Sequence, residues 1–210
     1  MGKHRSSFNP ERILSIGAHP DDIELGCGGT LAKYARDKVE ILALVLTRGE
    51  EISNGRDRVA ESKQALTLFG VDNAEFCEFH DTRAYEDLRA IILVIERLCR
   101  GFTPQRIYTN SKDDSHQDHA TVHAATIVAC REIPQVLCYE TFSTLPSFTP
   151  NVFEDITPFL DLKVEALENH ISQKKKEYMR REAVTSRARF RGLQARVGAA
   201  EAFEVHRLVL

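Results

Sequence analysis

A histidine and two acidic residues occupy four consecutive positions near the start of this chain, as His19-Pro20-Asp21-Asp22. A second cluster of the same kind, His116-Gln117-Asp118-His119, comes much later in the sequence. Imidazole and carboxylate groups are the usual ligands of a catalytic zinc ion, which takes three of them and keeps a fourth position for water or substrate. Two such clusters indicate a shared metal site far more strongly than either cluster alone.

The residue types allow a division of roles between metal binding and proton transfer. His19, Asp22 and His119 supply three metal ligands from two distant segments. Asp21 and His116 then remain free to move protons. The reaction class that this set favours is metal-assisted hydrolysis.

Each of these residues also has an ordinary structural explanation. An aspartate after a strand often caps the next helix, so Asp21 or Asp22 can cap a helix near Gly29 and Thr30. A single histidine early in a helix is more often a hydrogen-bonded structural residue than a ligand. For Asp118 two roles stay open, because its carboxylate can orient His116 or cap the helix that follows.

Both clusters come directly after apolar runs that are typical of buried strands. The expected strands are 13–18, 39–46, 76–79, 106–109 and 136–139. Segments with helical spacing alternate with them, at 30–36, 58–69, 88–99 and 120–130. This alternation predicts an α/β fold with a mainly parallel sheet flanked by helices. Ligands bind beyond the carboxyl ends of such strands, so the two clusters can face each other.

Glycines mark the expected ends of two helices, and the pattern changes in the last third of the chain. Gly70 and Gly101 occupy positions where helix C-caps favour glycine. After Pro146 a short strand-like run at 152–156, a long helical region from Phe159 and an apolar end at 203–210 follow. Because no flexible linker precedes this part, we expect a C-terminal helical elaboration of one domain over residues 1–210. Residues 1–10, polar and basic, are expected to be a disordered leader.

The composition of the chain excludes some classes of function but does not identify one. The chain has 42% hydrophobic and 28% charged residues and a formal net charge of -3, which gives no global attraction to nucleic acid. No apolar stretch approaches the ~20 residues of a membrane-spanning helix. The five cysteines are widely spaced without a Cys-x-x-Cys motif, which predicts reduced thiols and a cytoplasmic location.

A basic segment at residues 174–196 carries nine Lys and Arg against two Glu. A solvated helix face is the commonest explanation for such a run. The alternatives are a site for an anionic substrate, such as a nucleotide sugar or a phospholipid headgroup, or a nucleic-acid surface. For nucleic acid we find neither a groove-reading motif nor an aromatic stacking array.

With these residues in place, the chain resembles the LmbE-like, or PIG-L, family of zinc-dependent N-deacetylases. The first motif is Ala-His-Pro-Asp-Asp at 18–22 with the glycines and threonine at 26–30, and the second is His-x-Asp-His at 116–119. Further similarity covers nearly the whole chain, through Thr-Arg-Gly-Glu at 47–50, Arg58-x-x-Glu61, Leu68-x-Gly70, Ser172-Gln173 and Ala-Glu-Ala-Phe at 200–203. Ile23 and Gln117 depart from the usual motifs and leave the substrate subclass open.

The resemblance implies a Rossmann-like fold and removal of acetyl groups from N-acetylglucosamine-type compounds. It implies zinc ligation by His19, Asp22 and His119, although another divalent transition metal is possible. Asp21 resembles the general base of the family, and His116 would stabilise the oxyanion or protonate the departing amine.

Two further residues are candidates for substrate binding. The resemblance favours Arg58 near the substrate, where its guanidinium suits hydroxyls or phosphate, over a surface ion pair with Glu61. Asp81 is a weaker candidate for sugar hydroxyls because it follows a predicted strand.

The leading hypothesis is therefore a zinc-dependent N-deacetylase that acts on a small N-acetylated amino sugar, as a glycoconjugate or a nucleotide sugar. One alternative is an amidase for a different amide, such as a thiol conjugate, and another is a non-catalytic sugar-binding module that contains the metal. A homo-oligomer is possible.

Overall fold

A seven-stranded sheet with the order β3-β2-β1-β4-β5-β7-β6 forms the centre of the molecule. A computed structural model describes residues 10–52 and 57–209 of the chain. The strands are β1 Arg12–Gly17, β2 Glu40–Thr47, β3 Asn73–Phe79, β4 Arg106–Asn110, β5 Gln135–Tyr139, β6 Val152–Asp155 and β7 Ala200–Leu208. The first five strands pair in parallel, whereas β7 pairs antiparallel with both β5 and β6. The predicted, mainly parallel sheet is confirmed.

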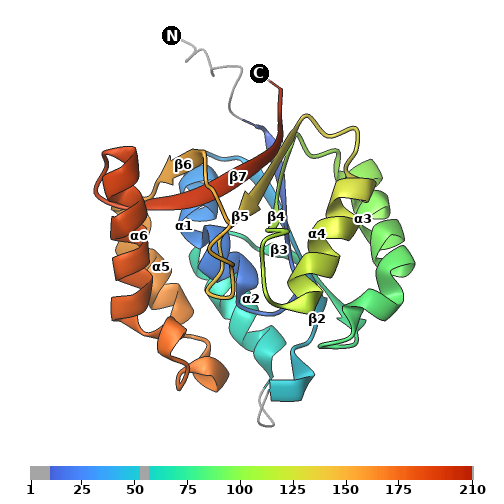
Figure 1. The fold of residues 1–210 in the computed structure, drawn as a ribbon, viewed down its shortest axis with the longest axis horizontal. Helices are drawn as coiled ribbons and strands as arrows, with labels where there is room; N and C mark the ends of the chain where they lie inside the picture. The colour runs from blue at the N-terminus through green and yellow to red at the C-terminus, as the bar shows by residue number, and fades with distance from the viewer. Residues whose placement is uncertain (1–9, 53–56, 210) are drawn as a thin grey trace.

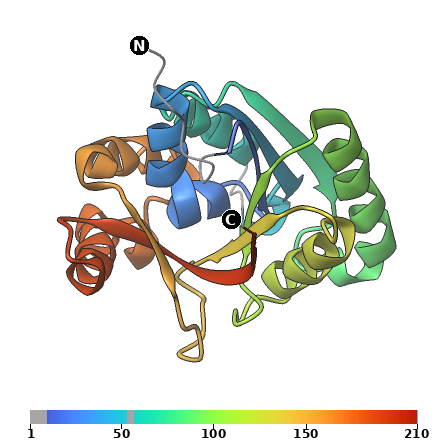
Figure 2. The ribbon, with the colours of Figure 1, turned by 90° about the horizontal axis from the view of Figure 1, so that it is seen from above.

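Helices cover both faces of this sheet (Figure 1). The α-helices are α1 Asp22–Arg36, α2 Arg58–Leu68, α3 Leu88–Phe102, α4 Gln117–Ala129, α5 Leu160–Leu167 and α6 Arg181–Ala195. The 3-10 turns are η1 Glu50–Ile52, η2 Ala84–Asp87, η3 Thr157–Phe159, η4 Ile171–Gln173 and η5 Glu177–Met179. Figures 1 and 2 show α1, α2, α5 and α6 on one side of the sheet and α3 and α4 on the other.

Alternate side chains of the same strands fill two separate cores. From β1, Ile13 packs toward α1 and α2, while Leu14 packs toward α3 and α4. The residues of β1, β2, β4 and β5 are almost all buried because these strands are covered on both faces, as their unbroken apolar runs predicted. The same prediction is wrong for 76–79, because β3 is at the edge of the sheet and its side chains there are half-buried or exposed. This packing fixes where each strand ends and therefore where the loops that follow begin.

The strand order reverses between β1 and β4. From β1 the chain moves outward to β2 and β3, then returns to place β4 on the other side of β1. The loops after β1 and β4 therefore diverge and leave a crevice at the carboxyl ends of these strands, the usual ligand position in open α/β sheets. The two clusters at residues 19–22 and 116–119 follow these two strands, so the fold brings them together.

Helix α1 begins at Asp22, earlier than the expected helix at 30–36. The additional part is joined to the expected helix across a kink, which a buried ion pair supports. Cys27 has non-helical dihedral angles at this kink. The carboxylate of Glu201 accepts hydrogen bonds from the N–H groups of Gly29 (2.9 Å) and Thr30 (2.7 Å). Lys163 donates to Glu201 and to the carbonyl of Leu25, so the interrupted helix bonds have partners.

The alternative in which Asp21 or Asp22 caps the segment at Gly29 and Thr30 is therefore wrong. Glu201 occupies that role from β7, far away in the sequence. The motif at 200–203 thus holds the helix that follows the first histidine cluster.

The two glycine-based predictions of helix ends have different outcomes. Gly70 has φ of 78° immediately after the end of α2, which confirms its role there. Gly101 lies inside α3 instead, and Thr103 forms the left-handed C-cap with φ of 48°. Local sequence favoured glycine for this position, but the packing of α3 continues for another turn.

Two other expectations concern the ends of the chain and the membrane. The predicted disordered leader at 1–10 falls almost entirely on residues outside the described ranges. Within residues 10–52 and 57–209, no helix is long and apolar enough to cross a membrane.

Candidate metal centre

Two buried imidazoles point nitrogen atoms at each other across the crevice. His19 lies after β1 and His119 lies in the first turn of α4, and their Nδ1 and Nε2 atoms are 3.3 Å apart. The other nitrogen of each ring contacts carboxylates: His19 Nε2 lies 3.1 Å from Asp81 and from Asp118, and His119 Nδ1 lies 2.9 Å from Asp114. When the rings are neutral, these contacts favour protons on the far nitrogens and leave Nδ1 of His19 and Nε2 of His119 to bind a common cation.

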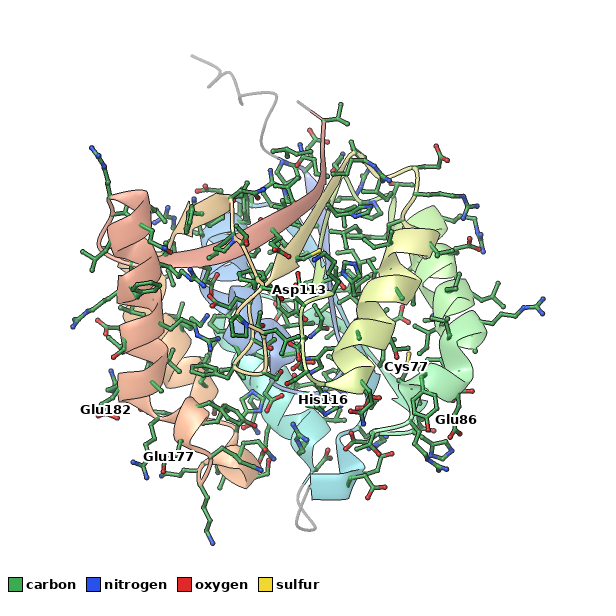
Figure 3. All side chains as sticks on the ribbon, in the orientation of Figure 1. Cys77, Glu86, Asp113, His116, Glu177 and Glu182 are labelled. Carbon is green, nitrogen blue, oxygen red and sulfur yellow. The ribbon has the colours of Figure 1, made fainter. Side chains whose placement is uncertain are left out.

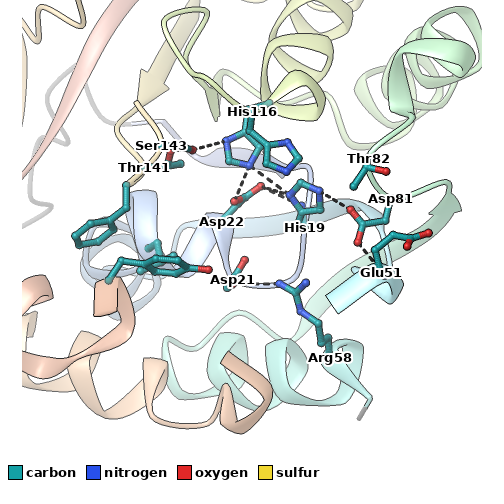
Figure 4. Close-up of a pocket in the computed structure, with 14 residues that line it drawn as sticks. His19, Asp21, Asp22, Glu51, Arg58, Asp81, Thr82, His116, Thr141 and Ser143 are labelled. Atoms are coloured by element: carbon teal, nitrogen blue, oxygen red, sulfur yellow. Dashed lines mark hydrogen bonds and ion pairs between the residues drawn. The ribbon is translucent and has the colours of Figure 1, made fainter. Parts of the chain in front are cut away.

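Asp22 closes the third side of this point (Figure 4). Its carboxylate oxygens lie 3.2 Å from His119 Nε2 and 3.6 Å from His19 Nδ1. Its Oδ2 also accepts hydrogen bonds from the backbone N–H groups of Ala18 and His19, both at 3.0 Å, which fixes the side chain.

The spacing of the three donor groups fits a zinc ion. Zinc bonds of 2.0–2.1 Å in a tetrahedron place neighbouring ligand atoms about 3.3 Å apart. The two imidazole nitrogens are 3.3 Å apart and His119 Nε2 lies 3.2 Å from Asp22 Oδ1, which agrees with that value, while His19 Nδ1 lies 3.6 Å from the other oxygen, Oδ2. Two imidazole nitrogens and a carboxylate directed at one point are a favourable site for a cation once the protons on the histidines are displaced. The structure thus brings the three predicted ligands together.

Other side chains of metal-ligating type lie within 4.8 Å of one another at the same place. One set adds His116 to His19 and His119, and another joins His19 to Asp81 and Asp118. The second set uses the opposite nitrogen of His19 and therefore forms an outer layer around the first ligand. The Nδ1 atom of His116 accepts the backbone N–H of Asp118, so only its Nε2 is left for the site.

Asp21 lies next to this site in a strained conformation. Its φ of 127° is rare for a residue with a side chain and costs about 1–3 kcal/mol. Although it precedes α1, its side chain makes no capping hydrogen bond and instead lies 3.1 Å from Arg58 Nη2 (Figure 4). Such strain is maintained when it serves the placement of a side chain, here a buried carboxylate at the wall of the crevice.

Arg58 is buried beneath Asp21. Its guanidinium donates to the carbonyl oxygens of Pro20 (2.8 Å) and Gly49 (3.3 Å) besides its contact with Asp21. The alternative of a surface ion pair with Glu61 is wrong, because Glu61 accepts hydrogen bonds from Ser172. Arg58 lines the pocket, but its contacts hold the loop that carries Asp21.

The pKa values of the adjacent carboxyl groups of Asp21 and Asp22 are shifted in opposite directions. Burial raises the pKa of Asp21 to about 6, an effect that the charge of Arg58 opposes. Burial acts on Asp22 in the same direction, but the charges and hydrogen bonds of His119 and His19 outweigh it and hold its pKa well below the usual value. Two neighbouring carboxyl groups thus differ in basicity, which suits one to bind a cation and the other to take up protons.

His116 lies beside both buried imidazoles, with ring centroids 4.6 Å from His19 and 4.7 Å from His119. Burial and the positive charge of those neighbours lower its pKa, so at neutral pH it is uncharged. Because Nδ1 accepts the N–H of Asp118, the proton of the neutral ring is on Nε2. The side chain is therefore a hydrogen-bond donor.

Asp118 contacts a different histidine from the expected one. Its carboxylate binds His19 and accepts the backbone N–H groups of Thr82 (2.7 Å) and Ala84 (3.1 Å), and the described residues show no bond from it to His116. It does not cap α4 either, since His116 is the N-cap. Asp118 thus orients a proposed ligand.

Asp81 and Asp114 complete this outer layer. Asp81 lines the pocket as expected of a substrate residue, yet its carboxylate contacts His19 and the N–H of Glu51. Asp114, which sequence reasoning missed, contacts His119 and accepts a hydrogen bond from Thr141 (2.6 Å). In the sequence, the only indication of this contact is that Asp114 lies five residues before His119, and that spacing matches neither helical nor strand periodicity.

Replacement of Asp118 is expected to weaken metal binding. Asp118→Asn keeps the side-chain volume but removes the charge that orients His19, and such outer-layer changes reduce metal affinity about 10–100-fold. Zinc titration with a competing chelator measures the effect. Asp161→Asn, on the exposed side of α5, is the matched control. Equal zinc affinity in Asp118→Asn and wild type would contradict this role.

Most of these side chains line one pocket. It has a volume of about 290 Å³ and is lined by each predicted site residue except Asp118, together with Tyr178 and Phe142 from the C-terminal half. Fold and site together define an α/β protein with a buried histidine–carboxylate centre at the switch point of a parallel sheet and an acid–base pair beside it.

Known proteins are similar to this chain in sequence and in fold. The PIG-L family model, described as GlcNAc-PI de-N-acetylase, matches residues 14–130. A protein of Escherichia coli (strain K12) described as uncharacterized deacetylase YaiS is 44% identical over 175 residues, 80% of this chain and 95% of that protein. The diacetylchitobiose deacetylase of Thermococcus kodakarensis is 26% identical over 202 residues, covering 81% of this chain and 73% of that enzyme.

The crystal structure of the conserved protein TT1542 from Thermus thermophilus has the same fold. It superposes with a TM-score of 0.83 at 27% identity and covers 94% of this chain and 95% of that protein. The chain belongs to the PIG-L family. The predicted family and Rossmann-like fold are confirmed, as is the enzyme class, an N-deacetylase hydrolase.

Proposed function

We propose that this protein removes the acetyl group from an N-acetylated amino sugar of the N-acetylglucosamine type, at a zinc ion held by His19, Asp22 and His119. The observation that carries the proposal is the convergence of two imidazole nitrogens and one carboxylate, 3.2–3.6 Å apart, beside a strained and buried Asp21. A bound zinc ion lowers the pKa of water toward neutrality and polarises the amide carbonyl.

The side chains around the ion divide the remaining work. Asp21 takes the proton from the attacking water, since its pKa of about 6 makes it ionised yet basic near neutral pH. Arg58 and the backbone strain hold that carboxylate against the crevice. The Nε2–H group of His116 donates a hydrogen bond to the carbonyl oxygen as negative charge develops there, and the proton that Asp21 has taken from the water is passed on to the departing amine.

The substrate class is supported by the relatives and by the shape of the site. The family description names an N-acetylglucosamine compound, and the relative from Thermococcus kodakarensis is named for an N-acetylated disaccharide. The pocket contains several carboxylates and hydroxyl groups, including Glu51, Thr82 and Ser143, which suit sugar hydroxyls. Arg58 and Asp81 line the same pocket, although their present contacts serve Asp21 and His19.

Acetate release is the direct test. Zinc-loaded enzyme is expected to release acetate from N-acetylglucosamine derivatives, to lose this activity after treatment with a chelator, and to regain it when zinc is added back. Acetate release that persists unchanged in chelator would contradict the metal-dependent mechanism. Release from a thiol-linked amide but from none of the sugars would favour the alternative amidase, and binding of sugar without turnover would favour the sugar-binding module.

The setting of the enzyme is part of the proposal. Five free cysteines support a reducing compartment, and we place the protein in the cytoplasm. One domain over residues 1–210 and possible self-association remain predictions. Nucleic acid is not a proposed partner.

A further inference from the structure

Two cysteine side chains meet between α3 and α4, on the face of the sheet opposite α1 and α2. Cys99 lies in the last turn of α3, and Cys130 is the C-cap of α4. Their Sγ atoms are 3.6 Å apart. The S–S bond of a disulfide is about 2.05 Å long, so the two sulfurs are within about 1.5 Å of bonding distance.

The two thiols of this pair differ in their access to solvent. Cys130 is only 1% exposed and belongs to the apolar core beneath α3 and α4. Cys99 is half-buried and packs against the edge of the same core. A small oxidant in solution therefore reaches Cys99 first and finds Cys130 directly behind it. An accessible thiol backed by a second thiol is the usual arrangement of redox-sensing cysteines.

The surroundings of Cys99 favour its thiolate, which is the reactive form of a cysteine. A hydrogen bond with the Cys130 thiol holds the pKa of Cys99 below its usual value, with help from the charge of Arg100 and against burial and the charge of Glu96. Glu96 is itself paired with Arg131 at 3.0 Å and with Arg100 at 3.6 Å. The same contact and burial raise the pKa of Cys130, so Cys130 is the thiol that keeps its proton.

The other three cysteines have different surroundings. Cys27 contacts a serine hydroxyl at 3.3 Å, and Cys138 contacts an imidazole at 3.6 Å. Burial raises the pKa of Cys77 to about 11 and that of Cys138 to about 12. Figure 3 shows Cys77 and His116 at the same end of the molecule, whereas Cys130 lies at the opposite end of α4. Cys77 is half-buried against the same core as Cys99 and is therefore a matched control.

We propose that Cys99 and Cys130 form a site of reversible oxidation, where a peroxide converts the two thiols into a disulfide that joins α3 to the end of α4. The Cys99 thiolate attacks one oxygen of hydrogen peroxide, the O–O bond breaks, and the hydroxide that leaves is protonated to water. Cys99 is then a sulfenic acid. The Cys130 sulfur attacks the Cys99 sulfur, so the S–S bond forms, the S–O bond breaks, and the departing hydroxide takes the Cys130 proton.

The electrons of this reaction balance. The two sulfurs lose two electrons and two protons in total, and the peroxide is reduced to two molecules of water. A dithiol reductant returns both electrons and restores the thiols, as expected for a protein of a reducing compartment.

The disulfide would close a covalent ring over residues 99–130. This ring contains β4 and α4, and therefore the second histidine cluster. His116 lies at the other end of α4, about 20 Å along the helix from Cys130, so the bond forms outside the metal centre. Since a ring of this size restricts the unfolded chain, oxidation is expected to stabilise the fold.

Thiol mapping of the reduced, zinc-loaded protein tests the site. After brief treatment with hydrogen peroxide, the free thiols are alkylated and the digested protein is analysed by mass spectrometry. The expected product is a disulfide-linked peptide pair that contains Cys99 and Cys130 and disappears with a dithiol reductant, while Cys77 stays alkylated. Undiminished alkylation of the pair, oxidation of Cys77 to the same extent, or oxidation of Cys99 without a disulfide would overturn the proposal.

Variants separate the attacking thiol from its partner. In Cys130→Ser, a sulfenic acid is expected to accumulate at Cys99 and to react with a cyclic diketone probe. Cys130→Ala, which suits the apolar surroundings, replaces this variant if the serine does not fold. In Cys99→Ser, the buried Cys130 should stay unlabelled, and Cys77→Ser should form the disulfide as wild type does. Equal labelling of Cys130 in Cys99→Ser would contradict the assigned order of attack.

Thermal unfolding tests the consequence of the bond for the fold. The midpoint of the oxidised protein is expected about 5–15 °C above that of the reduced protein. Cys99→Ser should have the same midpoint before and after peroxide treatment. An unchanged or lower midpoint in wild-type protein that carries the disulfide would contradict the stabilising role.

Discussion

Asp21→Asn is expected to retain zinc and to lose about 10²–10⁴-fold in turnover, the usual effect of removing a general base. Asparagine has nearly the same shape as aspartate, so this variant is the substitution that disturbs the unusual backbone at φ of 127° least. Its amide oxygen can still accept a hydrogen bond from Arg58, which limits structural damage. The variant therefore isolates the ability to take up a proton.

The measurement combines zinc content with kcat for acetate release. Asp72→Asn, exposed in the loop before β3, is the matched control and should behave as wild type. Unchanged turnover with full zinc content would remove Asp21 from the mechanism. Loss of zinc together with turnover would instead place Asp21 among the residues that hold the ion.

His119→Ala is expected to abolish stoichiometric zinc binding and to reduce turnover about 10³-fold or more, because the ion contributes several kcal/mol to the reaction. His206→Ala, an exposed histidine of β7, is the control. Since removal of His119 leaves Asp22 and Asp114 without their partner, His119→Gln provides a second variant of similar polarity. Full zinc occupancy in both His119 variants would contradict the ligand assignment.

The same residue gives zinc binding a definite dependence on pH. Burial lowers the pKa of His119, but Asp22 and Asp114 outweigh it and raise the pKa to about 9 in the metal-free protein. Zinc must displace this proton, so its affinity should rise with pH below about 9, by up to about tenfold per unit for each proton released. Titrations between about pH 6 and pH 8 measure the slope, and a zinc affinity that does not change over this range would contradict the expected proton release.

The architecture was largely predictable because it depends on local patterns. Unbroken apolar runs occur where strands are covered on both faces, as Ile13 and Leu14 show by packing into opposite cores. The start of α1 was not predictable, because the kink at Cys27 is supported by Glu201 from the last strand. Likewise, α3 continues through Gly101, since its tertiary packing outweighs a local preference for glycine at helix ends.

The candidate site likewise has some features that follow from local sequence and others that depend on tertiary packing. The sequence by itself determined which residue types lie at the ends of β1 and β4, because strand ends follow from hydrophobic pattern and the motifs at 19–22 and 116–119 follow directly. It also determined the family, through the same motifs.

Only the tertiary structure decided which atoms meet. It assigned Asp118 to His19 instead of His116, added Asp114 behind His119, and paired Arg58 with Asp21. These contacts join residues whose spacing carries no periodic signal, and they depend on how loops from different strands fold over one another. The stacked rings of Phe142 and Tyr178, with centroids 5.7 Å apart, meet in the same way, from the loop after β5 and from η5, which are far apart in the sequence.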